Sequence, residues 1–396
     1  MKKILSILLI ALLLFTTFSC VTKAPEQAVL EDSKIVKSGV SEIQKYGNLV
    51  LTLCSQDLLD KGFEYGDVVA IYLDGQLIVV PFCTNYSDVN VGSLVLRDAG
   101  GTLILAINMG DFATYYGIAV KEKHSDGTYE WIINDGKSLA DITLELSMHK
   151  KGGYKDEYLI HQLVRTNERA DYSSDEVFAN FREVEGGNLG KGALYRSSSP
   201  INNEIARASY ADKFTSMCGV QAVINLADNN EGILSYIAQD DFNSPYYKTL
   251  FEDGKVIALN LGVDFKAEEF KRGIAEGLKF FSTVKGPYLV HCNEGKDRAG
   301  FTSALLAALM GASYDELVKD YMTTYINYYH VEENSEQYEA VRKSNIDTIL
   351  ALIANLDSSA DLASVDYSIA AEAYIKSLGL SDAEISALKA NLSTNY

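Results

Sequence analysis

The segment VHCNEGKDRAGF, from Val290 to Phe301, places a cysteine, a lysine, an arginine and two carboxylates within twelve residues. It continues the apolar run GPYLV, which predicts a short buried strand, and it leads into GFTSALLAALMG, which predicts an apolar helix. A tight loop between a strand and a helix directs backbone N–H groups inward, and together with the helix N-terminus they favour an anion. The alternative is a buried cysteine that ends a strand and is followed by a solvated, charged turn.

Cys292 and Arg298 are the two side chains of this loop whose chemistry fits together. Arg298 follows Cys292 by six positions, and its planar guanidinium can hold two oxygens of a tetrahedral oxyanion. The same positive field favours the thiolate form of Cys292, which is the nucleophilic form. Gly295 allows the loop to turn without a Cβ clash. The segment therefore predicts a nucleophile inside a binding site for phosphoryl oxygens, with His291 as a support of the loop.

The rest of residues 151–396 alternates predicted strands with predicted helices. Strands are expected in KGALYRSS, GVQAVINLAD and KVIALNLG, and capping boxes are expected at Ser313 with Glu316 and at Ser381 with Glu384. One predicted helix carries its apolar residues on a single face: Phe270, Ile274, Leu278 and Phe281. This pattern predicts an α/β domain with a central sheet flanked by helices and a helical C-terminal part.

Residues 41–150 are β-rich and form a separate predicted domain. Asp74-Gly75 and Asp126-Gly127 each lie between two β-type runs, which is a hairpin signal. A small barrel or sandwich is the fold class that such closely spaced strands predict. The YGNL segment (46–49) and the strand order resemble the C-terminal β-barrel of the S-adenosylmethionine hydroxide adenosyltransferases. No cofactor is carried over from that resemblance, and the sequence leaves the role of this domain open.

The loop HCNEGKDRAGF resembles the HCxxGxxR signature of the cysteine-dependent protein tyrosine phosphatase superfamily. It is most similar to bacterial tyrosine phosphatases whose loop reads HCxxGKDR, a group whose loop is similar to that of lipid phosphatases. The upstream segment NFREVEGGNLGKGALYRSSSP (180–200) and the C-terminal segment LGLSDAEISALKANL (378–392) also resemble this group. The resemblance spans roughly residues 155–396, and it implies a cysteine-dependent phosphatase domain over residues 151–396.

The resemblance also implies roles for individual residues. Cys292 would attack phosphorus and form a phosphocysteine, while Arg298 would stabilise the transition state together with the loop residues Asn293, Glu294, Gly295 and Lys296. Asp297 would give a proton to the leaving oxygen, and its carboxyl would then have to carry that proton at the working pH. Asp264 and Asp228 are the alternative proton donors, and each is otherwise an ordinary turn residue after a strand.

Three further features of the region that resembles the phosphatases bear on substrate binding or on the second chemical step. Arg196 and Arg182 are assigned to substrate binding, with a structural salt bridge as the alternative for each. Lys296 would suit a highly phosphorylated substrate or would simply be exposed. A Ser or Thr usually follows the signature arginine and assists departure of the thiolate, but this chain has Ala299 there, with Thr302 and Ser303 one turn further on.

The sequence therefore predicts a phosphomonoester hydrolase, and a protein tyrosine phosphatase is the first expectation. A phosphoinositide or inositol-phosphate phosphatase is the alternative within the same chemistry. A surface module that binds phosphoryl groups with little turnover is the alternative from another class, because Ala299 could slow hydrolysis of the intermediate. The expected partners are accordingly a phosphorylated protein or a phosphoinositide.

The first twenty residues differ from the rest of the chain. A basic MKK precedes the apolar run ILSILLIALLLFTTF and then Ser19-Cys20, which is typical of a secretory signal, with a simple membrane anchor as the alternative. The segment resembles a bacterial lipoprotein signal, in which the cysteine, here Cys20, is lipidated. We therefore expect a signal peptide at 1–20, a linker at 21–40, and an exported protein tethered to a membrane through Cys20.

Composition excludes some other classes of protein. The formal net charge is −19, which argues against a nucleic-acid partner, because such a partner needs a basic face. The five histidines are scattered, and no cluster has the spacing of metal ligands, so neither a metal nor a cofactor is expected. Cys54 and Cys83 fall in one region and are either a disulfide or two free thiols.

Overall fold

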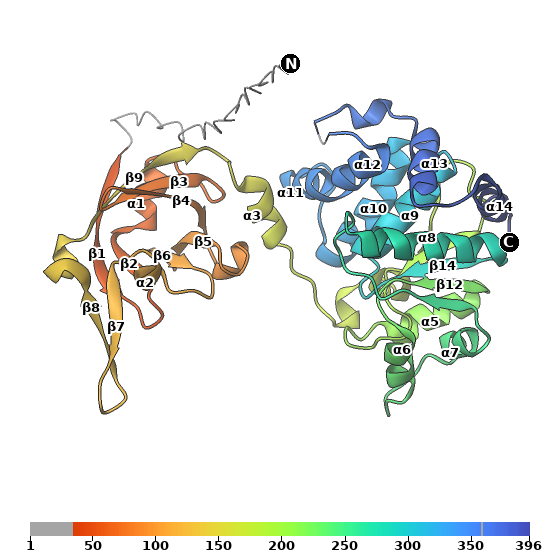
Figure 1. Ribbon diagram of the computed structural model, residues 1–396, viewed down its shortest axis with the longest axis horizontal. Helices are drawn as coiled ribbons and strands as arrows, with labels where there is room; N and C mark the ends of the chain where they lie inside the picture. The colour runs from red at the N-terminus through yellow and green to blue at the C-terminus, as the bar shows by residue number, and fades with distance from the viewer. Residues whose placement is uncertain (1–34, 358) are drawn as a thin grey trace, which may run out of the picture.

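The computed structural model describes residues 35–357 and 359–396 and has two domains, both visible in Figure 1. An N-terminal barrel is followed by helix α3 (Lys155–His161) and then by a C-terminal domain in which helices cover a sheet. The predicted fold class is confirmed, and the β-rich domain is a barrel. The predicted signal peptide, Cys20 and most of the linker lie outside the described residues.

Seven strands close the barrel in the order β1-β2-β6-β5-β4-β3-β9. The strands are β1 (Val36–Ile43), β2 (Leu49–Cys54), β3 (Val68–Leu73), β4 (Gln76–Cys83), β5 (Leu94–Asp98), β6 (Thr102–Ile107) and β9 (Thr143–Lys150). Asp74 and Gly75 join β3 to β4 and both have positive φ, as a two-residue turn between twisted strands requires.

The second predicted hairpin lies outside the closed barrel. β7 (Ala119–Lys123) and β8 (Tyr129–Ile133) form a two-stranded sheet of their own, connected by residues 124–128. The barrel domain also contains short helices: α1 (Ser55–Asp60), η2 (Tyr86–Asp88), α2 (Phe112–Tyr115), η3 (Asn134–Gly136) and η4 (Leu139–Asp141).

The barrel begins earlier than the sequence suggested. β1 starts at Val36, inside the stretch assigned to the linker, and it pairs with β9 from Val36 opposite Leu146. Val36, Ser38 and Val40 are buried, whereas the residues between them are more exposed, so the strand has the period of two that a barrel wall needs. The cysteines Cys54 and Cys83 are free thiols, the first exposed and the second buried.

Helix α3 contacts both domains, and Figure 1 shows it between the barrel and helix α11 (Glu336–Val341). Tyr158 packs against apolar barrel residues, whereas Ile160 and the following Leu163 pack against the core of the C-terminal domain. Residues 151–164 are therefore shared between the domains.

The C-terminal sheet has the order β10-β11-β14-β12-β13, and only β10 is antiparallel to its neighbour. Its strands are β10 (Arg182–Glu183), β11 (Leu194–Ser197), β12 (Ala222–Asn225), β13 (Val256–Ala258) and β14 (Tyr288–His291). The three central strands are β11, β14 and β12, and they end in register at Ser197, His291 and Asn225. The loops that follow them meet at this carboxyl edge, where α/β sheets bind ligands.

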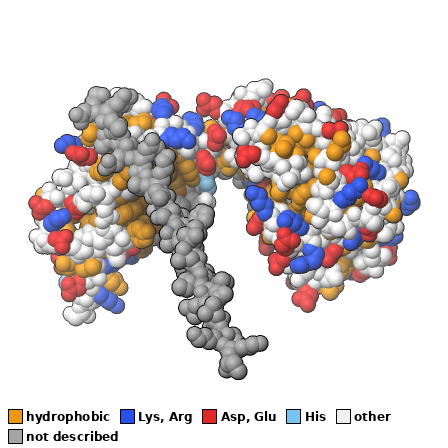
Figure 2. Space-filling view, turned by 45° about the horizontal axis from the view of Figure 1, so that its top comes forward, with side chains coloured by type: hydrophobic (Ala, Val, Ile, Leu, Met, Phe, Trp, Pro, Cys, Tyr) orange, Lys and Arg blue, Asp and Glu red, His pale blue; other side chains and the backbone are white. Residues whose placement is uncertain are grey.

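Helices cover both faces of this sheet and form the C-terminal part. They are η5 (Arg169–Asp171), α4 (Asp175–Phe178), α5 (Ala208–Met217), α6 (Asn230–Ile237), α7 (Pro245–Glu252), α8 (Glu268–Thr283), α9 (Asp297–Leu309), α10 (Tyr314–Tyr329), α11, η6 (Arg342–Ile346), α12 (Asp347–Ala354), η7 (Leu362–Ser364), α13 (Tyr367–Ser377) and α14 (Asp382–Leu392). The predicted face of α8 is buried, and both predicted capping boxes are present, at the starts of α10 and α14. On the surface of this domain, acidic and basic side chains are interspersed (Figure 2).

A buried charge cluster ties helix α10 to the edge of the sheet. The carboxylate of Asp320 accepts hydrogen bonds from Arg182 Nε at 2.9 Å and from Arg196 Nη1 at 2.6 Å. Burial alone would raise the pKa of Asp320, but the two guanidinium groups outweigh burial and hold that pKa below its ordinary value. The ionised carboxylate is thus part of the folded state, and removing it would leave two arginines without a counter-charge.

We predict that Asp320→Asn lowers the free energy of unfolding of the C-terminal domain by about 3 kcal/mol at pH 7. Because the pKa of Asp320 is depressed, its contribution is present above the ordinary carboxyl value of 3.8 and is lost as the pH falls through the folded-state value. The difference between the two proteins should therefore shrink below that pH. Urea unfolding followed by far-UV circular dichroism measures this difference. Tryptophan fluorescence would not, because the single tryptophan, Trp131, lies in the barrel domain.

The control for this experiment is Asp315→Asn, which removes an exposed carboxylate from the first turn of the same helix. Its effect should stay below about 1 kcal/mol. A pH-independent loss of stability in the Asp320 variant would contradict the assignment of that loss to an ionised carboxylate.

Candidate active site

The loop between β14 and α9 contains the predicted site residues and turns at Gly295. The φ angle of Gly295 is +69°, and a Cβ at this position would lie 2.3 Å from the carbonyl oxygen of Ser197. Glycine is therefore required both by the backbone conformation and by the close approach of the neighbouring strand.

The carbonyl oxygens of this loop accept hydrogen bonds from groups outside it. Arg196 Nη2 donates to the carbonyls of Gly295 at 2.7 Å and of Lys296 at 3.1 Å. Asn180 Nδ2 donates to the carbonyls of Glu294 at 3.1 Å and of Gly295 at 3.3 Å. The carbonyls of Glu294, Gly295 and Lys296 therefore point toward Asn180 and Arg196.

The backbone N–H groups of residues 293–298 have no hydrogen-bond acceptor among the described residues. The last of them belong to the first turn of α9, whose N-terminal N–H groups lack partners within the helix. We call this set of N–H groups, together with the Arg298 guanidinium, the anion cradle. Its donors are available to an oxyanion, and the helix dipole adds to their positive field.

Cys292 lies at the start of the loop, with 3% of its surface exposed, and its thiol is free. The preceding residue, His291, is buried, and its Nε2 lies 3.0 Å from the hydroxyl of Tyr247. That hydroxyl also accepts a hydrogen bond from Asn225 Nδ2, so Tyr247 links His291 to the end of β12. Burial lowers the pKa of His291 to about 3, which excludes it as a proton carrier near neutral pH. The expected supporting role of His291 fits this position.

The guanidinium of Arg298 is anchored at one nitrogen and free at another. Its Nη1 donates to the carbonyl of Leu261 at 2.7 Å and, more weakly, to that of Leu226 at 3.4 Å. Its Nε is buried and has no partner among the described residues. A buried donor without a partner is costly, and an oxyanion in the anion cradle would satisfy it.

The three candidate proton donors have different surroundings. Asp297 is the first residue of α9; its side chain is 40% exposed, and its Oδ1 lies 3.5 Å from Lys296 Nζ. Asp228 is buried and accepts a hydrogen bond from Asn225, and burial raises its pKa although Asn225 and Arg298 oppose the rise. Asp264 is exposed, and its carboxylate accepts a hydrogen bond from the backbone N–H of Lys266. This is the arrangement of an ordinary turn residue, which was the alternative to a proton donor.

The assignment of Arg196 to substrate binding was wrong, and Arg182 forms the structural salt bridge that was its alternative. The side chain of Arg196 is 0% exposed and lies between Asp320 and the loop carbonyls, so it cannot reach a substrate. Arg182 donates to Asp320 and to Asn180 Oδ1, so it contacts Asn180, which in turn binds the loop. Both arginines hold the loop in place, and the sequence could not show this because it reveals their charge but not the side on which they lie.

Lys296 and Glu294 lie beside each other at the rim of the loop. Lys296 Nζ is 3.7 Å from Glu294 Oε2 and lies over the rings of Tyr325 and Tyr329. Glu294 also accepts hydrogen bonds from Arg165, a residue that the sequence analysis did not select. Arg165 and Glu294 are 129 positions apart, so no local sequence pattern indicates that they pair. Asp320 was missed for the same reason, because it is 124 positions from Arg196. Asn180 begins the segment 180–200 that resembles the phosphatases, but its positive φ and its hydrogen bonds to the loop are visible only in the fold.

The hydroxyls that could replace the one missing at Ala299 are not equivalent. Thr302 donates its hydroxyl to the carbonyl of Arg298 at 2.9 Å, so this group is already engaged. Ser303 Oγ is buried and lacks a partner among the described residues.

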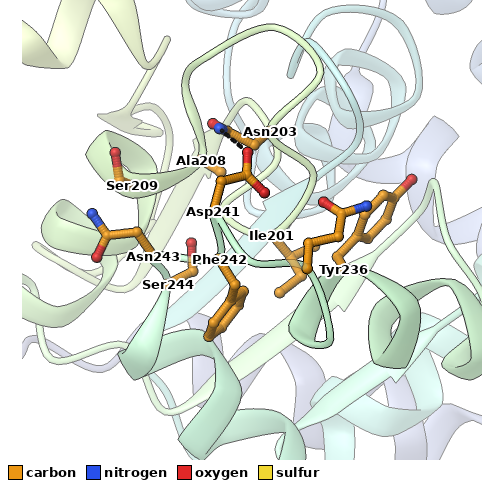
Figure 3. A pocket seen from close by; sticks show the side chains of 10 residues that line it. Ile201, Asn203, Ala208, Ser209, Tyr236, Asp241, Phe242, Asn243 and Ser244 are labelled. Atoms are coloured by element: carbon orange, nitrogen blue, oxygen red, sulfur yellow. Dashed lines mark hydrogen bonds between the residues drawn. The ribbon is translucent and has the colours of Figure 1, made fainter.

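A small polar cavity of about 130 Å³ is lined by residues from 201–209 and 236–244, among them Tyr236 (Figure 3). Asn203 Nδ2 donates a hydrogen bond to Asp241 Oδ2 at 3.4 Å in its wall, and none of its lining residues belongs to the 292–298 loop. The hydroxyl of Tyr236 accepts a hydrogen bond from Asn202 and also contacts Asp228. One residue that lines the cavity, Tyr236, is thus in contact with a candidate proton donor.

In residues 35–357 and 359–396, no three His, Cys, Asp or Glu side chains are grouped so that they could hold a metal ion. Over the same ranges, no helix combines the length and the apolar character that a bilayer crossing needs. Export and anchoring through Cys20 stay predictions.

Comparison with known proteins gave two family matches. Residues 40–125 match the C-terminal domain of the SAM hydroxide adenosyltransferases, in agreement with the resemblance noted for the barrel. No curated protein matched the chain. One solved structure, an uncharacterized conserved protein from Thermotoga maritima, is 21% identical with a TM-score of 0.22; the match covers 28% of this chain and 36% of that chain.

The second family match covers the domain that contains the anion cradle. The model of the tyrosine phosphatase family matches residues 176–394, which is more than half of the chain and includes Cys292, Arg298 and the strands and helices around them. The chain belongs to the tyrosine phosphatase family.

Proposed function

We propose that this protein hydrolyses phosphomonoesters through a phosphocysteine at Cys292 and that its substrate is a phosphotyrosyl protein. The observation that carries the proposal is the pairing of a free thiol with the anion cradle, in which the N–H groups of residues 293–298 and Arg298 Nε have no acceptor among the described residues. These donors match the equatorial oxygens of a phosphoryl group.

In the first step, the Cys292 thiolate attacks phosphorus, a P–S bond forms and the bond from phosphorus to the ester oxygen breaks. The leaving oxygen takes a proton from a carboxyl group. In the second step, water attacks phosphorus and gives up a proton to the same carboxylate; the P–S bond breaks, and inorganic phosphate and the thiolate are released. The anion cradle stabilises the charge on the equatorial oxygens in both steps.

Asp297 is the proton donor in this proposal, because it adjoins Arg298 and its partly exposed side chain can reach a leaving group at the rim. Asp228 is the competitor, because burial raises its pKa and a general acid must hold a proton. Asp264 is the weakest candidate, since its carboxylate is engaged in an exposed turn.

Lys296 bears on the choice between protein and lipid substrates. Its ammonium group lies between Glu294 at 3.7 Å and Asp297 at 3.5 Å, so nearby carboxylates already balance its charge. This reduces its value as a receptor for an additional phosphate and favours a singly phosphorylated substrate over a phosphoinositide.

The second candidate function, a module that binds phosphoryl groups with little turnover, is favoured by Ala299. Position 299 carries no hydroxyl and that of Thr302 is engaged, so of these three positions Ser303 alone offers a free hydroxyl to assist departure of the thiolate in the second step. A long-lived complex with a phosphotyrosyl peptide, without release of phosphate, would identify this function.

We predict that the protein hydrolyses p-nitrophenyl phosphate in the presence of EDTA and that Cys292→Ser lowers kcat by at least about 10⁴-fold, because the nucleophile is lost. Phosphate release measures the reaction, and mass spectrometry of acid-quenched protein detects the phosphocysteine. Cys218→Ser, which changes a free thiol elsewhere in the same domain, is the control. Full activity of the Cys292 variant would rule out the mechanism.

We predict that Asp297→Asn lowers kcat about 10²-fold for phenyl phosphate, whose leaving group needs a proton, and much less for p-nitrophenyl phosphate. Because a general acid must be protonated, activity of the wild type should fall as the pH rises through the pKa of that acid. The alkaline limb of the kcat profile should vanish in this variant and persist in Asp228→Asn. The reverse result would transfer the role to Asp228.

We predict that a phosphotyrosyl peptide is hydrolysed with a kcat/KM at least about tenfold higher than that for phosphatidylinositol phosphates in mixed micelles, since Lys296 is already paired. The two assays share the same phosphate readout. A preference for the lipid would assign the site to phosphoinositides.

A further inference from the structure

Arg165 lies outside the catalytic loop but binds it directly. It belongs to residues 162–168, which join α3 to η5, and this stretch precedes the part of the chain that matches the family. Its Nε donates to Glu294 Oε1 at 3.0 Å, and its Nη2 donates to the same oxygen at 2.5 Å. The Arg165 side chain is 19% exposed and that of Glu294 is 25% exposed, so the pair is largely shielded from water.

The position of Arg165 is fixed by a second, fully buried arginine. Arg165 Nη1 donates to Asn167 Oδ1 at 2.6 Å, and the same oxygen accepts from Arg207 Nη1 at 2.9 Å. Arg207 also donates to the carbonyl of Thr166 and lies against the rings of three aromatic residues: Tyr172, Phe178 and Tyr328. These contacts hold residues 162–168 against the C-terminal domain. They fix Arg165 where its guanidinium binds Glu294 of the β14–α9 loop.

Glu294 poses an electrostatic problem for an anion-binding loop. Its backbone N–H belongs to the anion cradle, but its carboxylate carries a negative charge that would repel a phosphate dianion. One carboxylate oxygen faces Arg165, and the other lies 3.7 Å from Lys296 Nζ. Although burial opposes it, the partnership with Glu294 raises the pKa of Arg165, so the pair is an ion pair.

We propose that Arg165 is a positioning residue that completes the active site: it neutralises Glu294 and fixes its carboxylate so that the anion cradle can accept a phosphate dianion. This proposal rests on the proposed function, because it concerns the same site. It assigns part of the affinity for substrate to the stretch between the two domains.

The charge-removing variant Arg165→Met tests this proposal in the full chain. With Glu294 left without its partner, KM for p-nitrophenyl phosphate should rise about tenfold, whereas kcat should change by less than about threefold. Glu294→Gln should lower KM, because it removes the repulsion altogether. The double variant should then bind substrate better than Arg165→Met does, which is a rescue that loss of folding could not produce.

A second measurement is independent of turnover. Tungstate, an inert tetrahedral oxyanion, should bind the Arg165→Met protein about tenfold more weakly than the wild type in titration calorimetry. The matched control is Arg169→Met, which removes a nearby arginine paired with Asp175 instead of with the loop. This control should keep the wild-type KM and tungstate affinity.

The outcomes separate the proposal from the function on which it rests. An active wild type whose KM and tungstate affinity do not change in Arg165→Met overturns the role of Arg165 and leaves the phosphatase intact. A loss that Glu294→Gln does not rescue shows a purely structural role and also overturns the proposal. A wild type that neither turns over phosphomonoesters nor binds tungstate overturns the proposed function itself.

Discussion

The loop between β14 and α9, which forms the candidate active site, depends on one buried guanidinium. Arg196 is fixed by Asp320 on one side and donates to the carbonyls of Gly295 and Lys296 on the other. A peptide group whose carbonyl is held in one direction presents its N–H in roughly the opposite direction. The two carbonyls that Arg196 holds therefore turn the N–H groups of Lys296 and Asp297 away from it, and both of these N–H groups belong to the anion cradle.

The position of the loop between a strand and a helix could be predicted from the sequence because its parts lie close together in the chain. Cys292, Gly295 and Arg298 fall within seven positions, and the strand before them and the helix after them have clear apolar patterns. The hairpin at Asp74-Gly75 and the two capping boxes are local for the same reason, and all of them are present in the fold.

What the sequence could not provide is the set of contacts made between distant segments. Asp320 meets Arg196 across 124 positions, and Glu294 meets Arg165 across 129. A single sequence does not indicate such pairings, so Arg196 was assigned to the substrate and Arg165 was not noticed. The start of the barrel at Val36 was missed for a related reason, because β1 is recognisable as a strand chiefly through its pairing with β9 more than a hundred residues later.

The arrangement around Arg207 has a consequence for how this protein can be divided. A fragment cut at residue 176, where the family match begins, would lose Arg165 and Asn167 while keeping Glu294 and Arg207, each deprived of a partner. A fragment that keeps both of these pairs must therefore begin before Arg165, upstream of the family boundary. A gene fusion that joined this domain to a different upstream domain would keep both pairs only if it included residues 165–175.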